Sequence, residues 1–463
     1  MSIVPDTGHW DRDVEIVVIG GGGCGLTAAL AAAQGGARVE VLEKLPHTTG
    51  NTGRSGGMIP AAGTKLQRAA GIEEAPESFA TDIFRKNGYA SDEQTTLHLC
   101  RISAGLVDWL VGEIGIDLVF VDDFKYPGHS QFRMHAPPNR TGASLINGLR
   151  RAVDAVPAIT LSASTTASGL IVGEQGLQGV IVRRSDREER WRSRKVILAN
   201  NGFAGSPDMV RKYCPAMASA LYFGGEGNTG EGILWGQELG AELEFMDAYQ
   251  AHASVATEQP ILITYSLIME GGIQVNSEAE RFGNETSGYS EHALAVLDQP
   301  GAVAYDIFDE NLHQLGLKFD GYRQAFDMGI IHRSDTAAGL AKTLGLDAGT
   351  LEQTLERYGE VAVGNIEDGF GRRDCRLLQP PLYGVKVTGA LFHTQGGLKV
   401  DHNARVLRPD GSAIDHLYAG GGAAAGISGH GPGGYLSGNG LLTALGYGML
   451  AGRHAAQTIS EEM

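Results

Sequence analysis

The chain has 463 residues, which is long enough for two or three domains with substantial cores. Its 37 basic and 54 acidic residues give a formal net charge of −17, which argues against nucleic acid or an anionic membrane surface as the main partner. No apolar run approaches the roughly 20 residues that cross a bilayer, and the polar N-terminus does not have the pattern of a signal segment. We therefore expect a cytoplasmic protein without a transmembrane segment.

The four cysteines, Cys24, Cys100, Cys214 and Cys375, are widely separated in the sequence. They form no CxxC pair, haem-attachment motif or iron–sulfur spacing, so we expect a reduced protein without a metal site. Glycine is the most unusual component, because its 67 residues are about twice the ordinary share and concentrate near the two ends of the chain. Such segments let the backbone lie close to a large flat or anionic ligand.

The first predicted elements are two strands on either side of a glycine turn and a helix. An apolar run at 14–19 leads into the glycine-rich turn 20–25, and an alanine-rich helix is expected over 26–33. A second apolar run follows at 38–43. This order is typical of a βαβ unit that binds a dinucleotide.

The glycines of this turn have separate predicted roles. Gly20 permits the tight turn, Gly22 lets the backbone approach a pyrophosphate, and Gly25 allows helix and strand to lie close together. The N–H groups at the start of the helix would then hold the phosphates. Glu43, 18 residues after Gly25, is placed to accept hydrogen bonds from an adenosine ribose.

Further glycine loops, helices and short strands follow along the chain. We expect a glycine- and hydroxyl-rich loop at 48–57, helical structure over 72–113, strands near 159–161, 169–172, 179–182 and 195–199, a helix that begins near 229–232 with a threonine hydroxyl at its N-terminus, a helix over 348–361, glycine turns at 420–422 and 431–440, and an apolar helix over 441–451. The segment 251–392 is poorer in glycine than the segments that flank it. This distribution predicts a nucleotide-binding domain in two pieces, 1–250 and 393–463, interrupted by a cap over 251–392.

The far glycine turns favour FAD over a nicotinamide cofactor. An ordinary nicotinamide dehydrogenase needs only the first glycine loop, whereas this chain has several more. The turn 438–440 would direct N–H groups toward the N1–C2=O edge of a flavin, where negative charge gathers on reduction.

The chain resembles the flavoprotein family of fumarate reductases, succinate dehydrogenases and 3-ketosteroid dehydrogenases over nearly its whole length. The matching segments are 20–25, 43–44, 50–52, 62–65, 71–72, 250–252, 275–276, 281–285, 393–397 and 417–419. The resemblance implies an α/β fold, with a Rossmann-like FAD-binding domain in two sequence segments and an inserted, mobile α+β capping domain that carries catalytic residues. The expected cofactor-binding residues are Gly20, Gly22, Gly25, Glu43, Lys44, Asn51, Thr52, Ser55, Gly56, Gly57, Asn200, Gly202, Gly421, Gly438, Asn439 and Leu441.

The resemblance also implies that FAD is bound non-covalently. Succinate dehydrogenases attach FAD through a histidine six residues before the first glycine of the pair that Gly56 and Gly57 match. Gly50 stands at that position in this chain, and His47 is out of register.

Two positions depart from the dicarboxylate-reducing members of the family. An arginine that donates a proton is expected four residues after Glu285, where this chain has Tyr289. A second arginine, which clamps a substrate carboxylate, is expected where this chain has Tyr435. Because the planar fork of arginine is hard to replace in bidentate carboxylate binding, fumarate and succinate are not the expected substrates.

Tyrosine at both positions resembles the ketosteroid dehydrogenase branch, in which one tyrosine removes a proton α to a ketone and another hydrogen-bonds the ketone oxygen. The predicted reaction is α,β-dehydrogenation of a cyclic ketone or a 3-ketosteroid-like compound, with hydride transfer to flavin N5. The predicted catalytic residues are Tyr289, Tyr435 and Ser437, and the predicted substrate-binding residues are His252, His393 and Tyr126.

Two alternatives stay open at this point. The same side chains serve the reverse reaction, so an ene-reductase that acts on an unsaturated carbonyl compound is the first alternative. A non-catalytic flavin-binding subunit is the second. In an enzyme, an external acceptor such as a quinone, a carrier or oxygen would reoxidise the flavin, because the sequence has no haem or cluster motif of its own.

Overall fold

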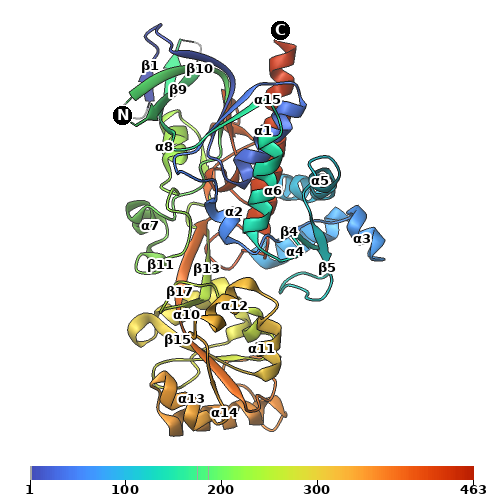
Figure 1. Ribbon diagram of the computed structural model, residues 1–463, viewed down its shortest axis with the longest axis vertical. Helices are drawn as coiled ribbons and strands as arrows, with labels where there is room; N and C mark the ends of the chain where they lie inside the picture. Colours follow the sequence, from blue (N-terminus) through green and yellow to red (C-terminus); the bar gives the residue numbers. More distant parts are fainter. Residues whose placement is uncertain (1–2, 175, 186, 463) are drawn as a thin grey trace. The chain divides into compact units, whose positions relative to one another are not determined.

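The structure of the protein is a computed structural model, which describes residues 3–174, 176–185 and 187–462. The chain divides into two compact units, which are described separately below (Figure 1). Unit 1 takes its described residues from Met1–Pro215, Gly224–Tyr249 and His393–Met463, and unit 2 from Ala216–Phe223 and Gln250–Phe392.

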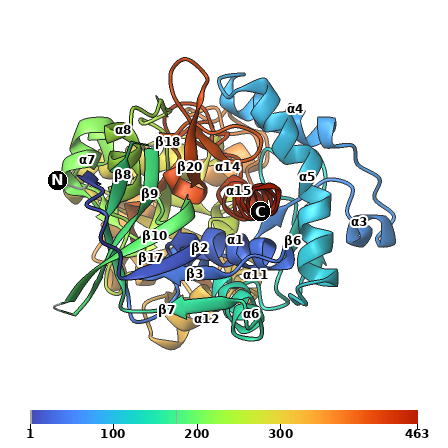
Figure 2. The same ribbon diagram turned by 90° about the horizontal axis from the view of Figure 1, so that it is seen from above.

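Unit 1 is built on a mixed sheet that has nine strands among the described residues. The strand order is β1-β8-β9-β10-β2-β3-β7, with β20 beside β10 and β19 beside β20 (Figure 2). Strands β20, β10, β2, β3 and β7 run parallel. Ile16–Ile19 of β2 and all of β3 are buried, as expected for parallel strands covered on both faces. The strands of unit 1 are β1 (Ile3–Pro5), β2 (Arg12–Ile19), β3 (Val39–Leu42), β4 (Ile59–Pro60), β5 (Val119–Val121), β6 (Met134–Ala136), β7 (Ile159–Ser162), β8 (Thr166–Gly173), β9 (Gly176–Arg184), β10 (Arg187–Leu198), β12 (Leu243–Glu244), β18 (Gly397–Leu398), β19 (Arg405–Leu407) and β20 (Ala413–Ala419).

The helices of unit 1 cover this sheet, and α1 lies beside α15 in both views (Figures 1 and 2). Its helices are α1 (Gly23–Gln34), α2 (Gly50–Arg54), α3 (Lys65–Ala69), α4 (Pro76–Asn87), α5 (Glu93–Gly112), α6 (Gly142–Asp154), α7 (Pro207–Tyr213), α8 (Glu231–Glu238) and α15 (Asn439–Glu461).

Small residues let α15 approach α1 closely. A Cβ atom at Gly448 would overlap the carbonyl oxygen of Cys24, and one at Gly452 would overlap that of Ala28. Because these contacts advance together along both helices, α1 and α15 run parallel. Their N-terminal ends therefore lie on the same side of unit 1.

We expect Gly452→Ala to destabilise the protein. The added methyl group would overlap backbone of α1, which cannot move without disturbing the sheet beneath it, so the free energy of unfolding should fall by about 2–3 kcal/mol. Gly105→Ala is the matched control, because a Cβ there meets no atom within 4 Å on α5 and should stabilise the helix by roughly 0.5–1 kcal/mol. Urea unfolding of both FAD-loaded variants measures the difference, and equal midpoints would contradict the close helix contact.

Unit 2 contains a second mixed sheet centred on the long strand β17. The order β11-β17-β15-β14 is joined by β13 and β16, which also pair with β17. Its strands are β11 (Leu221–Tyr222), β13 (Tyr249–Ala256), β14 (Ile273–Val275), β15 (Val303–Asp309), β16 (His332–Ser334) and β17 (Leu382–Thr394). Its helices are α9 (Ser266–Met269), α10 (Tyr289–Leu297), α11 (Glu310–Gly316), α12 (Asp320–Asp327), α13 (Ala337–Leu344) and α14 (Ala348–Ala362).

The predicted elements are largely present, with four local differences. The helical stretch 72–113 is divided into α4 and α5, because Gly88 adopts a left-handed φ of 64° and ends α4. Part of the loop at 48–57 forms the short helix α2. Helix α8 follows Gly230 at φ 83° and is not capped by Thr229, whose hydroxyl donates instead to the Glu231 carboxylate at 2.6 Å. The last helix begins at residue 439 and extends well beyond the predicted end.

Among the described residues, no helix has both the length and the apolar composition of a membrane span.

Candidate functional site

The turn between β2 and α1 forms an open cradle of backbone. Gly20 has a φ of 111°, and a Cβ atom there would overlap the carbonyl group of Ala199. A Cβ atom at Gly25 would overlap the carbonyl oxygen of Gly20, so helix and strand meet at van der Waals contact. Gly22, by contrast, has no atom within 4 Å of its Cβ position and faces open space at the start of α1. This geometry suits a phosphate group seated on the helix N-terminus.

Glu43 is held beside this turn at the end of β3. Its Oε2 accepts a hydrogen bond from the Gly21 amide at 2.9 Å, and its Oε1 accepts one from the Leu45 amide at 2.8 Å. The carboxylate is thereby oriented where a ribose would lie. Lys44 pairs with Glu231 at 3.0 Å, so its ammonium group ties the end of β3 to α8.

Asn51 on α2 fixes a neighbouring loop of unit 1. Its Oδ1 accepts hydrogen bonds from the Gly225 amide at 2.7 Å and from Asn228 Nδ2 at 2.9 Å. A Cβ atom at Gly50 would lie 3.7 Å from the Cα of Gly22, which places α2 next to the open side of the first glycine turn.

The rest of this segment forms a compact support. Thr52 is buried, and Ser55 donates to its carbonyl oxygen at 2.8 Å and accepts from the Gly57 amide at 3.1 Å. Gly57 has a φ of 69°, and Gly56 has no atom closer than 3.8 Å to its Cβ position. The Ser55 hydroxyl therefore serves local structure, and Gly56 presents accessible backbone.

The carboxyl end of β10 contributes a second approach to the same turn. Asn200 lies against Gly20, and its Oδ1 is buried without a hydrogen-bond partner among the described residues. A Cβ atom at Gly202 would lie 3.1 Å from the carbonyl oxygen of Gly422, and one at Gly421, which has a φ of 60°, would lie 3.3 Å from the Cβ of Cys24 in α1. Residues from two distant parts of the sequence thus converge on the start of α1.

The start of α15 carries a further buried group without a partner. Gly438 precedes the helix with a φ of 86°, and Asn439 is its first residue. The side chain of Asn439 is fully buried, yet neither its Oδ1 nor its Nδ2 has a partner among the described residues. Leu441 is buried in the same turn. A buried amide without hydrogen bonds costs about 1–3 kcal/mol unless a ligand supplies them.

The residues present fit FAD. Gly22 offers free backbone for a pyrophosphate, Glu43 is oriented for a ribose, and Asn439 offers an amide at a helix N-terminus for a polar ring edge. All of the predicted cofactor-binding residues lie in unit 1. When bound, FAD would be held by residues from the first and the last of the three segments of that unit.

Tyr435 lies near the start of α15 and is buried. Its phenol oxygen accepts a hydrogen bond from the Gly440 amide at 3.4 Å, and its ring is edge-on to His393 with centroids 5.6 Å apart. Burial raises the pKa of Tyr435 to about 12, although the amides of Gly440 and Gly438 act to lower it. The hydroxyl is therefore protonated near neutral pH, which suits a hydrogen-bond donor better than a base.

His393 is held in one tautomer by its neighbours. Gln395 Oε1 accepts from the Ser428 hydroxyl at 3.0 Å, so the amide nitrogen of Gln395 faces His393 Nδ1 at 2.8 Å and donates to it. The ring proton then lies on Nε2, next to Gly440 at the start of α15. Burial lowers the pKa of His393 to about 4, so this nitrogen is a neutral donor.

In unit 2, Tyr289 is part of an aromatic cluster. It is the first residue of α10, and its ring stacks on His252 at 5.1 Å and meets Tyr265 edge-on at 6.1 Å. His252 also stacks on Phe392 at 5.4 Å. The Nδ1 of His252 accepts from the Ser254 amide at 3.1 Å, and burial lowers its pKa to about 3, so its proton also lies on Nε2.

Ser437 and Tyr126 are joined through a third residue of unit 1. The carbonyl oxygen of buried Ser437 accepts from His129 Nε2 at 3.0 Å. The carbonyl oxygen of half-buried Tyr126 accepts from the His129 amide at 3.1 Å. The structure thus groups Tyr126, Ser437, Tyr435 and His393 within unit 1, and Tyr289 with His252 in unit 2.

Several residues around these groups were not among the sequence predictions. They are His129, Arg133, Tyr265, Phe392 and Gln395. Gln395 belongs to the matched segment 393–397, so this motif could have marked it as a residue that contacts His393. The others act through contacts between distant parts of the chain, and no local pattern marks them.

Five buried histidines predict acid sensitivity. Burial lowers the pKa of His129 and His252 to about 3 and that of His135, His292 and His393 to about 4. The unfolded chain takes up these protons from about pH 6.5 downward, whereas the folded chain does not, so stability is complete above that pH and falls toward pH 4. Each histidine should contribute about 1.4 kcal/mol per pH unit below pH 6.5. Urea unfolding at pH 7.5, 6.5 and 5.5 measures how far the free energy of unfolding falls with pH. His135→Gln should lessen this fall by the contribution of one histidine. A free energy of unfolding that does not change with pH would contradict the prediction.

The free cysteines take no evident part in the site. Cys24, Cys100 and Cys214 are buried, and Cys375 is half-buried. Burial raises the pKa of the Cys24 thiol to about 12, so it remains an uncharged contact between α1 and the glycines around it. In the described part of the chain, no group of three or more His, Cys, Asp or Glu side chains is arranged for a metal ion.

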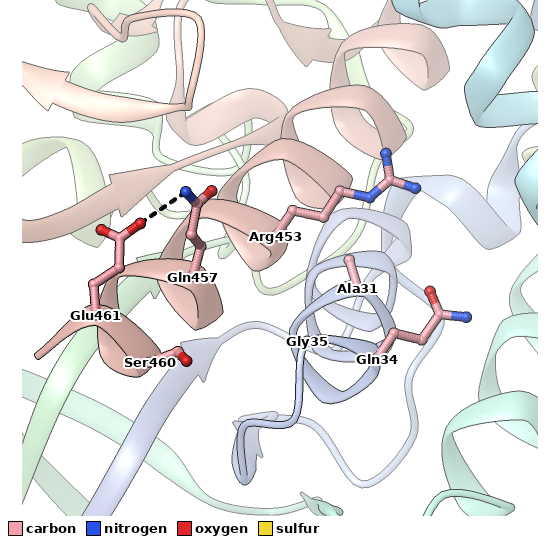
Figure 3. A pocket seen from close by; sticks show the side chains of 7 residues that line it. All are labelled: Ala31, Gln34, Gly35, Arg453, Gln457, Ser460 and Glu461. Carbon is pink, nitrogen blue, oxygen red and sulfur yellow. Dashed lines mark hydrogen bonds between the residues drawn. The ribbon is translucent and has the colours of Figure 1, made fainter. Parts of the chain in front are cut away.

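A hollow of about 500 Å³ lies elsewhere in unit 1, at the last turns of α1 and α15 (Figure 3). It is lined by Ala31, Gln34, Gly35, Arg453, Gln457, Ser460 and Glu461. Both helices present their carboxyl ends here, so the helix dipoles disfavour a phosphate. The hollow is therefore separate from the glycine turns and does not suit the cofactor.

Residues 15–441 match the family described as FAD binding domain (FAD_binding_2). The chain is 30% identical over 467 residues to the "Probable fumarate reductase Ifc3" of Shewanella frigidimarina, an alignment that covers 97% of this chain and 78% of that protein. It is 27% identical to the 3-oxosteroid 1-dehydrogenase of Mycobacterium tuberculosis, over 96% of this chain and 98% of that protein.

Two solved structures are also similar to this chain over nearly its whole length. The open conformation of a flavocytochrome c3 fumarate reductase has a TM-score of 0.84 and 29% identity, over 97% of this chain and 79% of that one. The 3-ketosteroid-Δ4-(5α)-dehydrogenase of Rhodococcus jostii RHA1, in complex with 4-androstene-3,17-dione, has a TM-score of 0.75 and 25% identity, over 98% of this chain and all of that one.

Proposed function

Since the chain belongs to the FAD binding domain family, we propose that it desaturates a cyclic ketone or a 3-ketosteroid-like compound next to the carbonyl group. It is an FAD-dependent oxidoreductase of the group that contains fumarate reductases and ketosteroid dehydrogenases, which act on carbon–carbon bonds. The observation that carries the proposal is the presence of Tyr289 and Tyr435 where the resemblance to fumarate reductases predicts arginine.

The two tyrosines have different proposed roles. Tyr435, a neutral buried phenol, donates a hydrogen bond to the ketone oxygen and stabilises negative charge that develops there. Tyr289 accepts the proton from the carbon α to the ketone, as a general base. His393 and His252 each present an Nε2 proton and add neutral donors for the substrate.

The proposed reaction removes two hydrogens from the substrate. Tyr289 acts as a base in its phenolate form, after its own proton has passed to solvent. The α C–H bond breaks when its proton passes to that phenolate oxygen, and the electron pair is held as an enolate whose oxygen Tyr435 stabilises. The carbonyl re-forms as the electrons make the new C=C bond, and the β carbon loses a hydride. FAD, held by the glycine turns of unit 1 together with Glu43 and Asn439, would supply the acceptor for that hydride, and a quinone, a carrier or oxygen would then take up the two electrons.

The surroundings of Tyr289 support a flat, apolar substrate. Phe392 contacts Phe223 at 5.0 Å between centroids and stacks on His252, which extends the cluster with Tyr265 into a set of aromatic faces. Ring-shaped apolar molecules pack well on such faces, whereas a dicarboxylate would find no cation among these five side chains. We further propose that unit 1 is the FAD-binding domain and that 251–392 is the capping and substrate domain.

Anaerobic flavin reduction tests the proposal. FAD-loaded protein is mixed with saturated 3-ketosteroids, substituted cyclohexanones and succinate, and the loss of flavin absorption is followed. We expect bleaching by one of the ketone classes and none by succinate. Bleaching by succinate alone would overturn the proposed substrate class.

The similarity to fumarate reductases, and to a urocanate reductase of Eggerthella lenta at 28% identity, supports the reverse direction as a second candidate. Chemically reduced protein is mixed with cyclic enones, fumarate and urocanate, and flavin reoxidation is followed without oxygen. An ene-reductase would be favoured if an enone reoxidises the reduced flavin faster than the corresponding saturated ketone reduces the oxidised flavin. A flavin that responds to no compound in either direction would favour a non-catalytic subunit.

We also propose that FAD is held non-covalently. No histidine occupies the position of Gly50, and His47 is exposed in the preceding loop. Acid precipitation should therefore release all of the flavin into the supernatant. Yellow colour retained in the washed precipitate would contradict this prediction.

A further inference from the structure

A buried cluster of charges lies behind the turn that precedes α15. The side chain of Arg133 is fully buried and pairs with Asp82 at 2.7 Å and with Glu74. Ser130 donates to the same Asp82 oxygen from its amide and its hydroxyl, each at 2.7 Å. The guanidinium carbon of Arg133 lies 4.6 Å from the centre of the Phe79 ring. Buried ion groups of this kind often stabilise a fold no better than apolar side chains of the same size would. Stability alone therefore does not account for this cluster.

His129 connects Arg133 to the turn. Its Nδ1 lies 2.9 Å from Arg133 Nη1 and accepts a hydrogen bond from it, because a guanidinium can only donate. The ring proton therefore lies on Nε2, which donates to the Ser437 carbonyl oxygen at 3.0 Å. Burial and then the charge of Arg133 lower the pKa of His129 to about 3, so the ring is neutral and its tautomer is fixed.

The Ser437 carbonyl leads directly to Tyr435. That carbonyl and the Gly438 N–H belong to one peptide group, so a donor on the oxygen makes the N–H more positive. Burial raises the pKa of the Tyr435 hydroxyl, while the amides of Gly440 and Gly438 lower it. Hydrogen bonds thus run from the guanidinium through the imidazole to the Ser437 carbonyl oxygen. The N–H of the same peptide group, that of Gly438, is one of the two amides that act on the Tyr435 hydroxyl, and the other, that of Gly440, donates to its oxygen at 3.4 Å.

We propose that His129, oriented by Arg133, is a positioning residue that makes the Tyr435 hydroxyl a stronger hydrogen-bond donor. A more positive Gly438 N–H stabilises negative charge on the phenol oxygen. The hydroxyl then gives its proton more fully to a ketone oxygen. The effect on desaturation rests on the proposed function, whereas the acidity of Tyr435 can be measured without any substrate.

The test places a fluorinated tyrosine at position 435 of the FAD-loaded protein and follows its ¹⁹F resonance with pH. Hydrogen bonds to the phenolate favour the charged form, so weakening them raises the pKa. We expect His129→Leu to raise the titration midpoint by about 0.5–1 pH unit. His129→Asn should recover most of this shift, because its amide can accept from Arg133 and donate to Ser437.

His135→Leu is the matched control. His135 is also buried in unit 1, but its ring contacts the Thr64 hydroxyl at 2.8 Å and the Ile59 carbonyl oxygen at 3.3 Å. Its loss should lower stability and leave the Tyr435 midpoint in place. A parental midpoint in His129→Leu, or an equal shift in His135→Leu, would overturn the inference. Should His129→Leu not fold, His129→Phe keeps a ring beside Phe79 and takes its place.

A kinetic measurement separates this inference from the proposed function. With a ketone that bleaches the parent flavin, flavin reduction in His129→Leu should be about threefold slower. The expected effect is smaller than the change in the acidity of the Tyr435 hydroxyl, because the rate of such a step follows the acidity of the donor only in part. The same substitution should have no effect in a Tyr435→Phe background. If no ketone bleaches the flavin in any variant, the proposed function fails, and the resonance titration still decides whether His129 acts on Tyr435.

Discussion

Tyr289→Phe and Tyr435→Phe are each expected to give a yellow, FAD-loaded protein whose flavin is reduced by the ketone substrate at least about a hundredfold more slowly. Tyr289 lies outside the glycine turns, and at position 435 the substitution leaves the backbone of the turn 431–440 unchanged, so the flavin content should stay near one per chain. Stopped-flow absorption measures the reduction rate, and extraction of the flavin measures its content.

For Tyr435, the lost group is the proposed donor to developing negative charge. Phenylalanine keeps the ring contact with His393 but removes the oxygen that accepts the Gly440 amide. Removal of one such donor costs about 10²–10³ in the rate of the chemical step. Binding of the ketone should weaken much less, because the apolar contacts of the ring remain.

For Tyr289, the lost group is the proposed base. Phenylalanine retains the stacking on His252 and the start of α10. General-base removal typically costs about 10²–10⁴. Exchange of the α proton with deuterated solvent should be lost together with flavin reduction, whereas in Tyr435→Phe exchange should be slowed in proportion to reduction.

Two other buried phenols serve as controls. The Tyr358 hydroxyl donates to the Gly271 carbonyl oxygen at 3.0 Å in unit 2, and the Tyr418 hydroxyl pairs with His454 at 2.9 Å in unit 1. Phenylalanine at either position should cost about 1 kcal/mol of stability and leave the reduction rate unchanged. Parental rates in both Tyr289→Phe and Tyr435→Phe would refute the roles proposed for the two tyrosines.

Substitutions at Gly22 and Gly25 should separate the binding of FAD from the formation of the fold. Gly22 is the N-cap of α1, with extended backbone angles that any residue adopts and open space at its Cβ position. Aspartate there should cap the helix and leave the protein folded. Its negative charge would lie where the pyrophosphate sits, so FAD affinity should fall at least about a hundredfold.

Gly25→Ala should have the opposite outcome. The new methyl group would overlap the Gly20 carbonyl oxygen, so helix and strand must separate and the protein should fail to fold stably. Circular dichroism reports the fold, and flavin titration of the refolded protein reports FAD affinity. A folded Gly25→Ala variant, or a Gly22→Asp variant that binds FAD normally, would contradict the roles given to these glycines.

The sequence was most informative where a local pattern determines local structure. Apolar runs and glycine spacing were enough to predict β2, α1 and β3 in their order, because each depends on residues close to one another. The break between α4 and α5 was missed, since a helical periodicity continues on both sides of Gly88 and only its left-handed backbone reveals the turn. Thr229 was misread for a similar reason, because a carboxylate two residues away competes for its hydroxyl.

The candidate site was predictable in its residue types but not in their hydrogen bonds. Family-like motifs pointed to Tyr435 and His393, and the structure puts their rings in contact. The tautomer of His393 depends on Gln395 and Ser428, and the support behind Ser437 comes from His129, far earlier in the chain. Such networks depend on tertiary neighbours, which no spacing rule encodes.

Because α1 packs against α15, the predicted cofactor site can form only late in the synthesis of the chain. The two helices come from near the start and near the end of the chain, and both contribute to the predicted cofactor site. At a synthesis rate of about 5–20 residues per second, α1 waits roughly 20–80 s on the ribosome for its partner, while the continuous stretch of unit 2 is already complete. The flavin cradle is therefore assembled after the continuous stretch of unit 2, so FAD should be loaded only once α15 has been made, and cells short of riboflavin should accumulate a folded unit 2 attached to an open, protease-sensitive unit 1.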